Sequence, residues 1–381
     1  MTQPHPNAIF VDRQITAWLG TVVRVAEGGR ELTAEQVQPA SLDLRLGRFL
    51  YEIRASFLPE RQSVESRLEE LAIQRIDLDD EGVVLLPGHV YLASLEETLA
   101  LPAGVFARFN PRSSTGRCDL FTRVVVPGYP RFDETPRGWS GSPWLEIAPL
   151  SFPMHVRRGD RLCQARFASG SPALTHEELL ERYRADPLCH DENGPLPLDA
   201  VRFDGQGGLE LRVGLDGREP CAWRARRCES PVRFSERDAH DPADYWEPIR
   251  AEPSASGPHH AVLAPGHFYL FASRERIRIP ADLAAEMLPV DVGIGELRNN
   301  YAGFFDSGFG AHDHSPRGTP AVLEVRAHDV PFLVEEGQVL FRLQFFRTSQ
   351  TPDHLYGEGR ESYRHQDLTL ARTFRSPLSG S

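Results

Sequence analysis

The chain has 381 residues, 40% of them hydrophobic, and this length suits two domains better than one. Its net charge of −12 excludes nucleic-acid binding through a broad basic surface. No apolar run approaches the ~20 residues of a membrane span, and no basic segment precedes an apolar one at the start, so we expect neither a membrane anchor nor a secretory signal.

The cysteines and the basic residues narrow the chemistry further. Five cysteines, an odd number without a regular framework, favour a reducing compartment, so we expect the protein to be cytoplasmic. All 42 basic residues are arginines, and this excludes Schiff-base catalysis and a lysine general base.

In chain order, the predicted elements are mainly short strands separated by Gly, Pro and Asp. Strand and helix do not alternate, which disfavours a parallel α/β sheet. The pattern predicts a mainly β protein with few short helices, built as two sandwich- or barrel-like domains. We expect helices over about 12–19, 63–74 and 175–184, and strands over 89–95, 121–126, 143–150, 161–167 and 339–346.

The second half of the chain repeats the first. The segment LLPGHVYLASLEETLALPAGV (85–105) resembles LAPGHFYLFASRERIRIPADL (263–283), and equivalent residues lie 178 positions apart. The same interval separates Glu146 from Glu324. A constant interval over a long stretch indicates a tandem duplication. We therefore expect two domains, 1–190 and 191–381, with the boundary in the stretch near 170–200.

The stretch FNPRSSTGRCDL (109–120) gathers cations and hydroxyls in a short loop. Guanidinium groups and hydroxyls suit phosphate, and a glycine lets main-chain N–H groups approach it. The alternative is a solvated turn with surface arginines. The equivalent stretch 289–300 carries Asp291 and Glu296, which would repel phosphate, so only the first copy suits an anion. The candidate phosphate-binding residues are Arg112, Ser113, Ser114, Thr115, Gly116 and Arg117.

Glu146 interrupts the apolar strand SPWLEIAPL (142–150). Two interpretations are open. By alternation its side chain would face solvent, which is the commoner case for an acid in a strand. Otherwise it is a carboxylate placed to take a proton from water and return it. Its recurrence as Glu324 also allows a shared structural pair.

Other catalytic patterns are incomplete. HDE (190–192) matches half of the zinc deaminase signature, but PCAWRARRC (220–228) places six residues between its cysteines, so we expect no zinc catalysis. Ser113 and Ser114 have no histidine nearby in the sequence, as a serine nucleophile would need. Neither a nucleophile elbow nor a Walker loop nor a dinucleotide-binding glycine motif is present.

Four blocks of the first half resemble the dCTP deaminases, enzymes of the dUTPase-like fold. The likeness spans roughly 10–170, with a weaker echo over 205–347, and is closest to the long, duplicated bacterial type. The blocks are QPASLDLRLGRF (38–49), PRSSTGR (111–117), GWSGSPWLEI (138–147) and RRGDRLCQARF (157–167).

This resemblance implies two tandem dUTPase-like domains, each a distorted β-barrel of the β-clip kind. It implies a homo-oligomer, either a trimer or a pseudo-symmetric assembly of repeats, with active sites shared between subunits. The implied reaction is the hydrolytic removal of ammonia from C4 of cytosine in dCTP, which gives dUTP for pyrimidine deoxynucleotide supply. Magnesium would arrive with the triphosphate, no zinc would be used, and neither nucleic acid nor membrane would be a partner.

The resemblance also implies roles for residues at matching positions. Glu146 would be the general base, and the phosphate loop would hold the triphosphate. Asp133 would contact the deoxyribose, Trp144 and Leu145 would present main-chain groups to the base, and Gln164 would complete the substrate-binding set.

One departure concerns the deoxyribose contact. FDETPRGW (132–139) is longer than the family's Ile-Asp-Pro-Gly-Trp, and Asp306 in the second copy matches that aspartate better than Asp133 does.

A second departure concerns the family's C-terminal lid, Lys-Tyr-Arg-x-Gln. SYRHQ (362–366) keeps Tyr363, Arg364 and Gln366 but has Ser362 in place of the lysine. The lid follows the second copy, whereas the phosphate loop lies in the first. Either the active sites combine both repeats, or one repeat is competent and the other structural. We expect catalysis at the first copy, with Glu324, Asp306 or the lid as possible contributions.

Three functions remain open. We prefer a dCTP deaminase. The same fold could act as a dUTP pyrophosphatase, or perform both reactions, with Asp133 or Asp306 activating water at the α-phosphate. The third function is a non-catalytic nucleotide-binding regulator.

Overall fold

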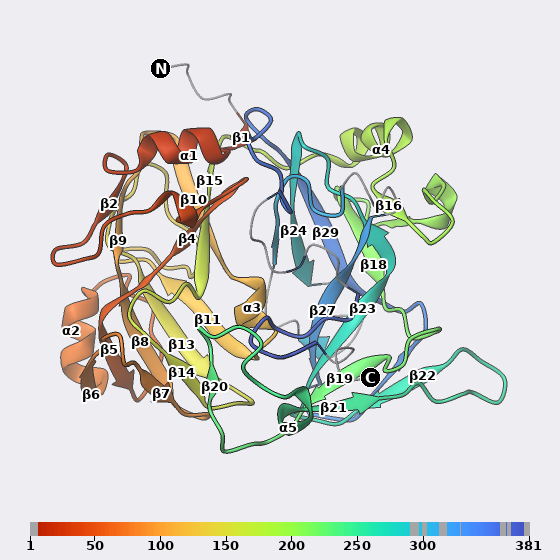
Figure 1. Cartoon of the computed structure of the whole chain (residues 1–381). Helices are drawn as coiled ribbons and strands as arrows, with labels where there is room; N and C mark the ends of the chain where they lie inside the picture. The colour runs from red at the N-terminus through yellow and green to blue at the C-terminus, as the bar shows by residue number, and fades with distance from the viewer. Residues whose placement is uncertain are drawn as a thin grey trace. The chain divides into compact units, whose positions relative to one another are not determined.

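The computed structural model describes residues 7–289, 297–298, 303–311, 318–327, 329–358, 363 and 367–376. They form two compact units, and both are mainly β, as predicted (Figure 1). Unit 1 contains the chain as far as Ser171 together with Arg227–His240 and Ala371–Arg375. Unit 2 contains Pro172–Arg226 and Asp241–Leu370.

Unit 1 consists of short strands with three brief α-helices. Its elements are β1 (Ala8–Ile9), α1 (Asp12–Trp18), β2 (Val23–Val25), the 3₁₀ turn η1 (Ala34–Gln36), β3 (Val37–Gln38), β4 (Ser41–Leu44), β5 (Leu46–Ile53), α2 (Val64–Leu71), β6 (Ala72–Asp77), β7 (Val83–Leu85), β8 (Val90–Leu95), β9 (Glu97–Ala100), β10 (Val105–Pro111), α3 (Ser113–Gly116), β11 (Leu120–Val125), β12 (Ser140–Gly141), β13 (Trp144–Pro149), β14 (Met154–Val156), β15 (Cys163–Ser169) and β20 (Val232–Arg233).

Unit 2 repeats this plan. Its elements are α4 (His176–Ala185), β16 (Cys189–His190), the 3₁₀ turn η2 (Leu198–Ala200), β17 (Arg202–Phe203), β18 (Gly208–Arg212), β19 (Ala222–Ala225), α5 (Pro242–Tyr245), β21 (Trp246–Ile249), β22 (His260–Leu263), β23 (Phe268–Ile277), β24 (Leu283–Pro289), β25 (Leu297–Arg298), β26 (Phe304–Phe305), β27 (Thr319–Ala327), β28 (Phe332–Glu335) and β29 (Val339–Arg347).

Two sheets carry the candidate site of unit 1. One runs in the order β11–β13–β8–β5–β6 and contains Glu146. The other runs β1–β15–β4–β3, with β10 also paired to β15, and leads directly into the phosphate loop. Smaller sheets, β12–β9–β2 and β20–β14–β7, complete the unit.

The predicted helices are confirmed, and their ends follow from capping. The hydroxyl of Ser63 accepts a hydrogen bond from Ser66 N (3.1 Å) at the start of α2. Thr175 and Glu178 form a capping box at the start of α4. Helix α2 lies beside β5 and β6 and packs against them (Figure 1). Val64 and Leu68 provide its buried face.

The predicted duplication is visible in the strand pairing of the two units. β8 pairs with β13 in unit 1, and β23 pairs with β27 in unit 2. Each copy places a tyrosine hydroxyl under the preceding turn. Tyr91 Oη accepts from Leu86 N (3.1 Å), and Tyr269 Oη accepts from Ala264 N (2.9 Å). The same hydrogen bond at the 178-residue interval shows that the repeats share one local design.

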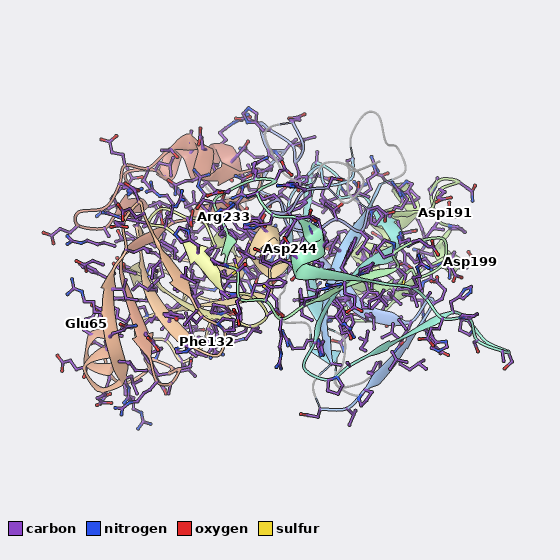
Figure 2. The ribbon with its side chains drawn as sticks, turned by 60° about the horizontal axis from the view of Figure 1, so that its bottom comes forward. Glu65, Phe132, Asp191, Asp199, Arg233 and Asp244 are labelled. Carbon is purple, nitrogen blue, oxygen red and sulfur yellow. The ribbon has the colours of Figure 1, made fainter. Side chains whose placement is uncertain are left out.

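Unit 1 is completed by two segments from late in the chain, Arg227–His240 and Ala371–Arg375, which we call the clasp. The two segments bind each other through main-chain hydrogen bonds, among them Ala239 N to Thr373 O (2.9 Å). Strand β20 of the clasp, which includes the Arg233 labelled in Figure 2, pairs in parallel with β14. Thr373 and Phe374 are buried, so this part of the clasp belongs to the packed interior of unit 1.

All five cysteines have free thiols. Among the described residues, every helix is too short or too polar to cross a membrane.

Candidate active site

Glu146 is buried rather than facing solvent, so the simple alternation interpretation is wrong. Its side chain is 3% exposed, and Oε1 accepts from Arg123 Nε at 2.7 Å. The pair follows from strand register, because Arg123 on β11 lies directly opposite Glu146 on β13. A buried carboxylate with a fixed cationic partner is a charge held in a defined place.

Arg123 is itself held from three sides. Its Nη2 donates to Ser56 Oγ (2.8 Å), its guanidinium lies 3.9 Å from the ring centroid of Phe132, and Nε binds Glu146. Phe132 is one of the side chains labelled in Figure 2. A guanidinium stacked on an aromatic ring and bonded at two nitrogens has little rotational freedom.

Asp133 lies close to this ion pair. Its Oδ1 accepts from Val124 N (2.6 Å), and Val124 follows Arg123 on β11. Burial raises the pKa of the Asp133 carboxyl to about 7, against the opposing effects of its hydrogen bond and of Arg123. Glu146 also contributes to this rise, which places the two carboxylates within electrostatic reach. The φ of Asp133 is +59°, an uncommon conformation for a residue other than glycine.

Aromatic side chains line the same region. Tyr51 on β5 and Trp144 on β13 lie with ring centroids 6.2 Å apart, and both are partly buried. With Phe132 they pack against the small apolar cluster that contains Leu92 and Val125. Partly buried aromatic faces beside a charged pair suit a flat, polar ring. Leu145 is fully buried, so only its main chain is available to a ligand.

The phosphate loop forms the short helix α3 after β10. Arg112 N donates to Leu162 O (3.0 Å), and Thr115 Oγ1 donates to the same oxygen (2.7 Å). These bonds fasten the loop to the main chain just before β15. Ser113 is exposed, whereas Ser114, Thr115 and Arg117 are buried. The hydroxyl proton of Thr115 is therefore used to fix the loop.

A buried aspartate contacts an arginine of the loop. Asp43 on β4 is fully buried, and its Oδ1 lies 3.1 Å from Arg112 Nε. Gln164 lies opposite Asp43 on β15, and its Oε1 accepts from Ser41 Oγ (3.3 Å). The block QPASLDLRLGRF (38–49) therefore orients both an arginine of the loop and the glutamine that we expected at the substrate.

The phosphate loop and Glu146 lie toward different ends of β11. Leu120, at its start, pairs with Pro149, whereas Arg123 pairs with Glu146. Three residues of strand separate these positions by roughly 10 Å, and the chain between Arg117 and Leu120 adds to that separation. In one unit, the ionic partner of Glu146 is Arg123 and not an arginine of the loop.

Unit 2 keeps the glutamate but differs around it. Glu324 on β27 is 7% exposed. Phe109 N donates to Asp133 O in unit 1, and its equivalent Met287 N donates to Gly303 O in unit 2. The register therefore places Gly303, which has no carboxylate, at the position of Asp133.

The remaining second-repeat candidates are only partly described. Asp306 is 8% exposed and lies three residues beyond Gly303, and Tyr363 is buried. Arg364 and Gln366 of the expected lid lie outside the described residues, as do Asp291 and Glu296.

The two cysteines of the incomplete zinc pattern form hydrogen bonds with carbonyl oxygens. Cys221 Sγ donates to Ile249 O (3.3 Å), and Cys228 Sγ donates to Ser230 O (3.6 Å). Over the part of the chain that the structure describes, His, Cys, Asp and Glu side chains do not gather in groups of three or more that could hold a metal ion.

Two important residues were missed from the sequence. Arg123 gives no local signal, because it stands in an ordinary strand sequence and acquires its partner only through pairing with β13. Asp43 lies within a block that we had identified, but its contact with Arg112 spans 69 residues of chain. A pairing prediction for β11 and β13 could have found the first; only the tertiary fold reveals the second.

Comparison with known proteins identifies the family of this chain. The sequence model of the N-terminal domain of 2'-deoxycytidine 5'-triphosphate deaminase matches residues 7–171, and that of the C-terminal domain matches residues 175–374. The chain belongs to the dCTP deaminase family. The crystal structure of the dCTP deaminase from Agrobacterium tumefaciens superposes with a TM-score of 0.82 and is 39% identical, over 92% of this chain and all of that one.

Shorter relatives of the dCTP deaminase family match part of the chain. A protein of Dictyoglomus thermophilum named "dCTP deaminase, dUMP-forming" is 31% identical over 167 residues, which cover 42% of this chain and 79% of the relative. A protein of Natronomonas pharaonis named "dCTP deaminase" is 32% identical over 145 residues, 36% of this chain and 69% of the relative. The first name specifies dUMP as the product, whereas the second name states no product.

Proposed function

We propose that this chain is a dCTP deaminase whose general base is Glu146. The observation that carries the proposal is the buried Glu146 carboxylate, held by Arg123 beside Tyr51 and Trp144. Such a carboxylate can take a proton from water as the oxygen adds to C4 of cytosine. Of the two water hydrogens, one ends on N3 and one leaves with ammonia, while the oxygen becomes the O4 carbonyl of uracil.

The phosphate loop would bind the other end of the substrate, dCTP with its magnesium. Arg112 and Arg117 supply charge that is focused locally in a protein of net charge −12. Ser113 is exposed at the loop and available to a phosphate oxygen. Asp133 would contact the deoxyribose, and Gln164 would line the pocket behind it. These roles follow the family pattern, and the local geometry supports them.

We further propose that one active site takes Glu146 from one copy of the chain and the phosphate loop from another. The separation of the two along β11 supports this assignment. Mixing Glu146→Gln with Arg117→Ala chains tests it. If subunits share sites, the mixture recovers part of the activity that neither variant has alone. If each chain carries complete sites, the mixture is no better than the sum of its parts.

The reaction itself is tested by incubating the protein with dCTP and magnesium and measuring ammonia. Glu146→Gln should abolish release of ammonia while dCTP still binds, because the amide cannot take a proton. Arg117→Ala should chiefly weaken binding. A Glu146→Gln variant that behaves like the parent would favour a nucleotide-binding regulator instead.

A second candidate function is the further hydrolysis of the product to dUMP and pyrophosphate. Two observations favour it: relatives at 30–31% identity are named dUMP-forming, and Asp133 has a carboxyl pKa of about 7 close to Glu146. That carboxyl could activate water at the α-phosphate near neutral pH. Separating the nucleotides after the reaction distinguishes deamination alone from deamination followed by hydrolysis to dUMP. Accumulated dUTP supports deamination alone, whereas dUMP with pyrophosphate supports both steps.

A further inference from the structure

Two arginines of unit 1 meet at one buried carboxylate. Asp43 is fully buried. Its Oδ1 lies 3.1 Å from Arg112 Nε, and its Oδ2 lies 3.7 Å from Arg161 Nη1. The two arginine side chains are 22% and 25% exposed, so each keeps part of its surface accessible to a ligand. A single negative charge therefore holds two cations at one edge of the phosphate loop.

The main chain fastens Arg161 to the loop as well. The carbonyl of the next residue, Leu162, accepts from both Arg112 N and Thr115 Oγ1. Two residues of the loop are thus hydrogen-bonded to the carbonyl of the residue that directly follows Arg161. These hydrogen bonds fix the main chain from which the Arg161 side chain extends, directly beside the loop.

The second repeat lacks this whole arrangement. At the 178-residue interval, the sequence has Val290 in place of Arg112 and Val339 in place of Arg161. By strand register, Glu210 takes the position of Asp43, because Glu210 pairs with Arg342 as Asp43 pairs with Gln164. Glu210 faces Arg202 at 3.6 Å. A structural arginine would be expected in both copies, as Arg45 and Arg212 are. Arg161 instead occurs only in the copy that has the phosphate loop.

A competing contact shows how the site would respond to a ligand. Arg161 Nη1 donates to Glu35 O (2.8 Å), and Nη2 lies 3.7 Å from the carboxylate of Glu35. The Glu35 side chain is 80% exposed, so it can turn into solvent at little cost. Asp43 cannot leave, because it is enclosed.

We propose that Arg161 is a further phosphate-binding residue of unit 1, held in place with Arg112 by Asp43, and that Glu35 competes with the phosphate for it. This inference rests on the proposed function, because the phosphates are those of the nucleotide. Arg161 binds the charged end of the substrate, and Asp43 acts as a positioning residue for both guanidinium groups.

The test measures binding of magnesium dCTP and of inorganic tripolyphosphate to the full chain. Arg161→Gln should weaken both by roughly 10- to 100-fold, the usual size of a lost charged hydrogen bond. Arg161→Lys should keep only part of the parent's affinity, because a lysine gives a point charge without the planar guanidinium group. Glu35→Gln should strengthen both by a few fold. Arg24→Gln, an exposed arginine elsewhere in unit 1, is the matched control and should bind like the parent.

The outcomes separate the two proposals. A parent protein that binds tripolyphosphate but not dCTP contradicts the proposed function, and tripolyphosphate then still decides the role of Arg161. Folded Arg161→Gln protein that binds tripolyphosphate like the parent overturns the inference, as does a parent that binds neither probe. Weakening by Arg161→Gln together with strengthening by Glu35→Gln supports it, and this pair of opposite signs is not expected from a general loss of structure.

Discussion

The two repeats keep one buried ion pair almost unchanged. In unit 1, Glu97 accepts from Arg45 through N (2.9 Å) and Nε (2.7 Å). In unit 2, Glu275 accepts from Arg212 through N (2.9 Å) and Nε (2.5 Å). Both carboxylates are almost completely buried, so neither partner can be lost alone without leaving an isolated charge in the interior.

A neighbouring pair is kept with its charges exchanged. Glu96 Oε1 lies 2.6 Å from Arg158 Nε in unit 1. At the 178-residue interval, unit 2 has Arg274 and Glu336, 3.8 Å apart. The attraction is preserved although each residue has been replaced by one of opposite sign. Opposite charges therefore face each other at these equivalent positions in both repeats.

The residues around the candidate site show no such preservation. Asp133 has become Gly303 at the same register position, and Arg112 and Arg161 correspond to valines. The comparison teaches that folding requirements are shared by the repeats, whereas the chemical groups are concentrated in one. The retained Glu324 is therefore not sufficient evidence for a second active site.

The largest expected effect distinguishes the two glutamates. Glu146→Gln should lower kcat for dCTP by about 10²- to 10⁴-fold, because proton transfer to and from water is lost. Glu324→Gln should stay close to the parent, because unit 2 lacks the aspartate beside it. Ammonia release under saturating dCTP measures both. Equal losses in the two variants would show that the repeats both contribute to catalysis.

The shared buried pair gives the next largest effect. Glu97→Ala should reduce the free energy of unfolding by about 3–5 kcal/mol, because Arg45 remains buried without its partner. Glu275→Ala should reduce it by a similar amount through Arg212. Urea denaturation followed by circular dichroism measures both, with the exposed Asp80→Ala as control. A change below about 1 kcal/mol in either variant would contradict the equivalence of the pairs.

For the pair with exchanged charges, a second substitution should restore stability that the first one removes. Glu96→Arg should destabilise unit 1 by about 1–3 kcal/mol, because it places like charges together and removes the acceptor for Arg30 N. Adding Arg158→Glu, which reproduces the charge order of unit 2, should recover part of this loss. Thermal melting of the single and double variants measures the interaction. A double variant less stable than the sum of the two single changes would refute the exchange.

The last expected effect is the pH dependence of stability that Asp133 confers. Burial raises the pKa of its carboxyl to about 7 in the folded protein, from 3.8. Between these two pKa values the folded state keeps a proton that the unfolded chain releases. The contribution of this carboxyl to the free energy of unfolding is therefore full below pH 4 and is lost as pH rises through 7. The Tm of the parent relative to Asp133→Asn should fall between pH 4 and 7 and then level off.

The exposed Asp80→Asn serves as the control for that profile and should show no such window. A Tm difference between the parent and Asp133→Asn that does not change with pH would show that Asp133 titrates in its ordinary range.

Much of the fold could be predicted from local patterns. Ser63 and Thr175 mark helices that form where expected, because capping acts within one turn. The constant interval of 178 residues predicted the repeat, since equivalent strands must keep their spacing. The burial of Glu146 could not be predicted by alternation, because its environment depends on an arginine from another strand.

The clasp is a further feature that no local pattern reveals. Phe374 lies with its ring centroid 6.3 Å from that of Phe152, and Cys118 Sγ lies 3.9 Å from Thr373 Oγ1. These contacts link the end of the chain to the residues that follow the phosphate loop. Pairing over such a distance in sequence depends on the path of the whole chain.

The amino-acid sequence alone determined the β class, the duplication and the types of residue at the candidate site, because strand periodicity, spacing and motif composition are written locally. Only the tertiary structure decided that Arg123 faces Glu146, that Asp43 joins Arg112 to Arg161, and that Gly303 replaces Asp133. The physical reason is that these relations are set by register between strands and by burial, and both arise only when distant segments pack together.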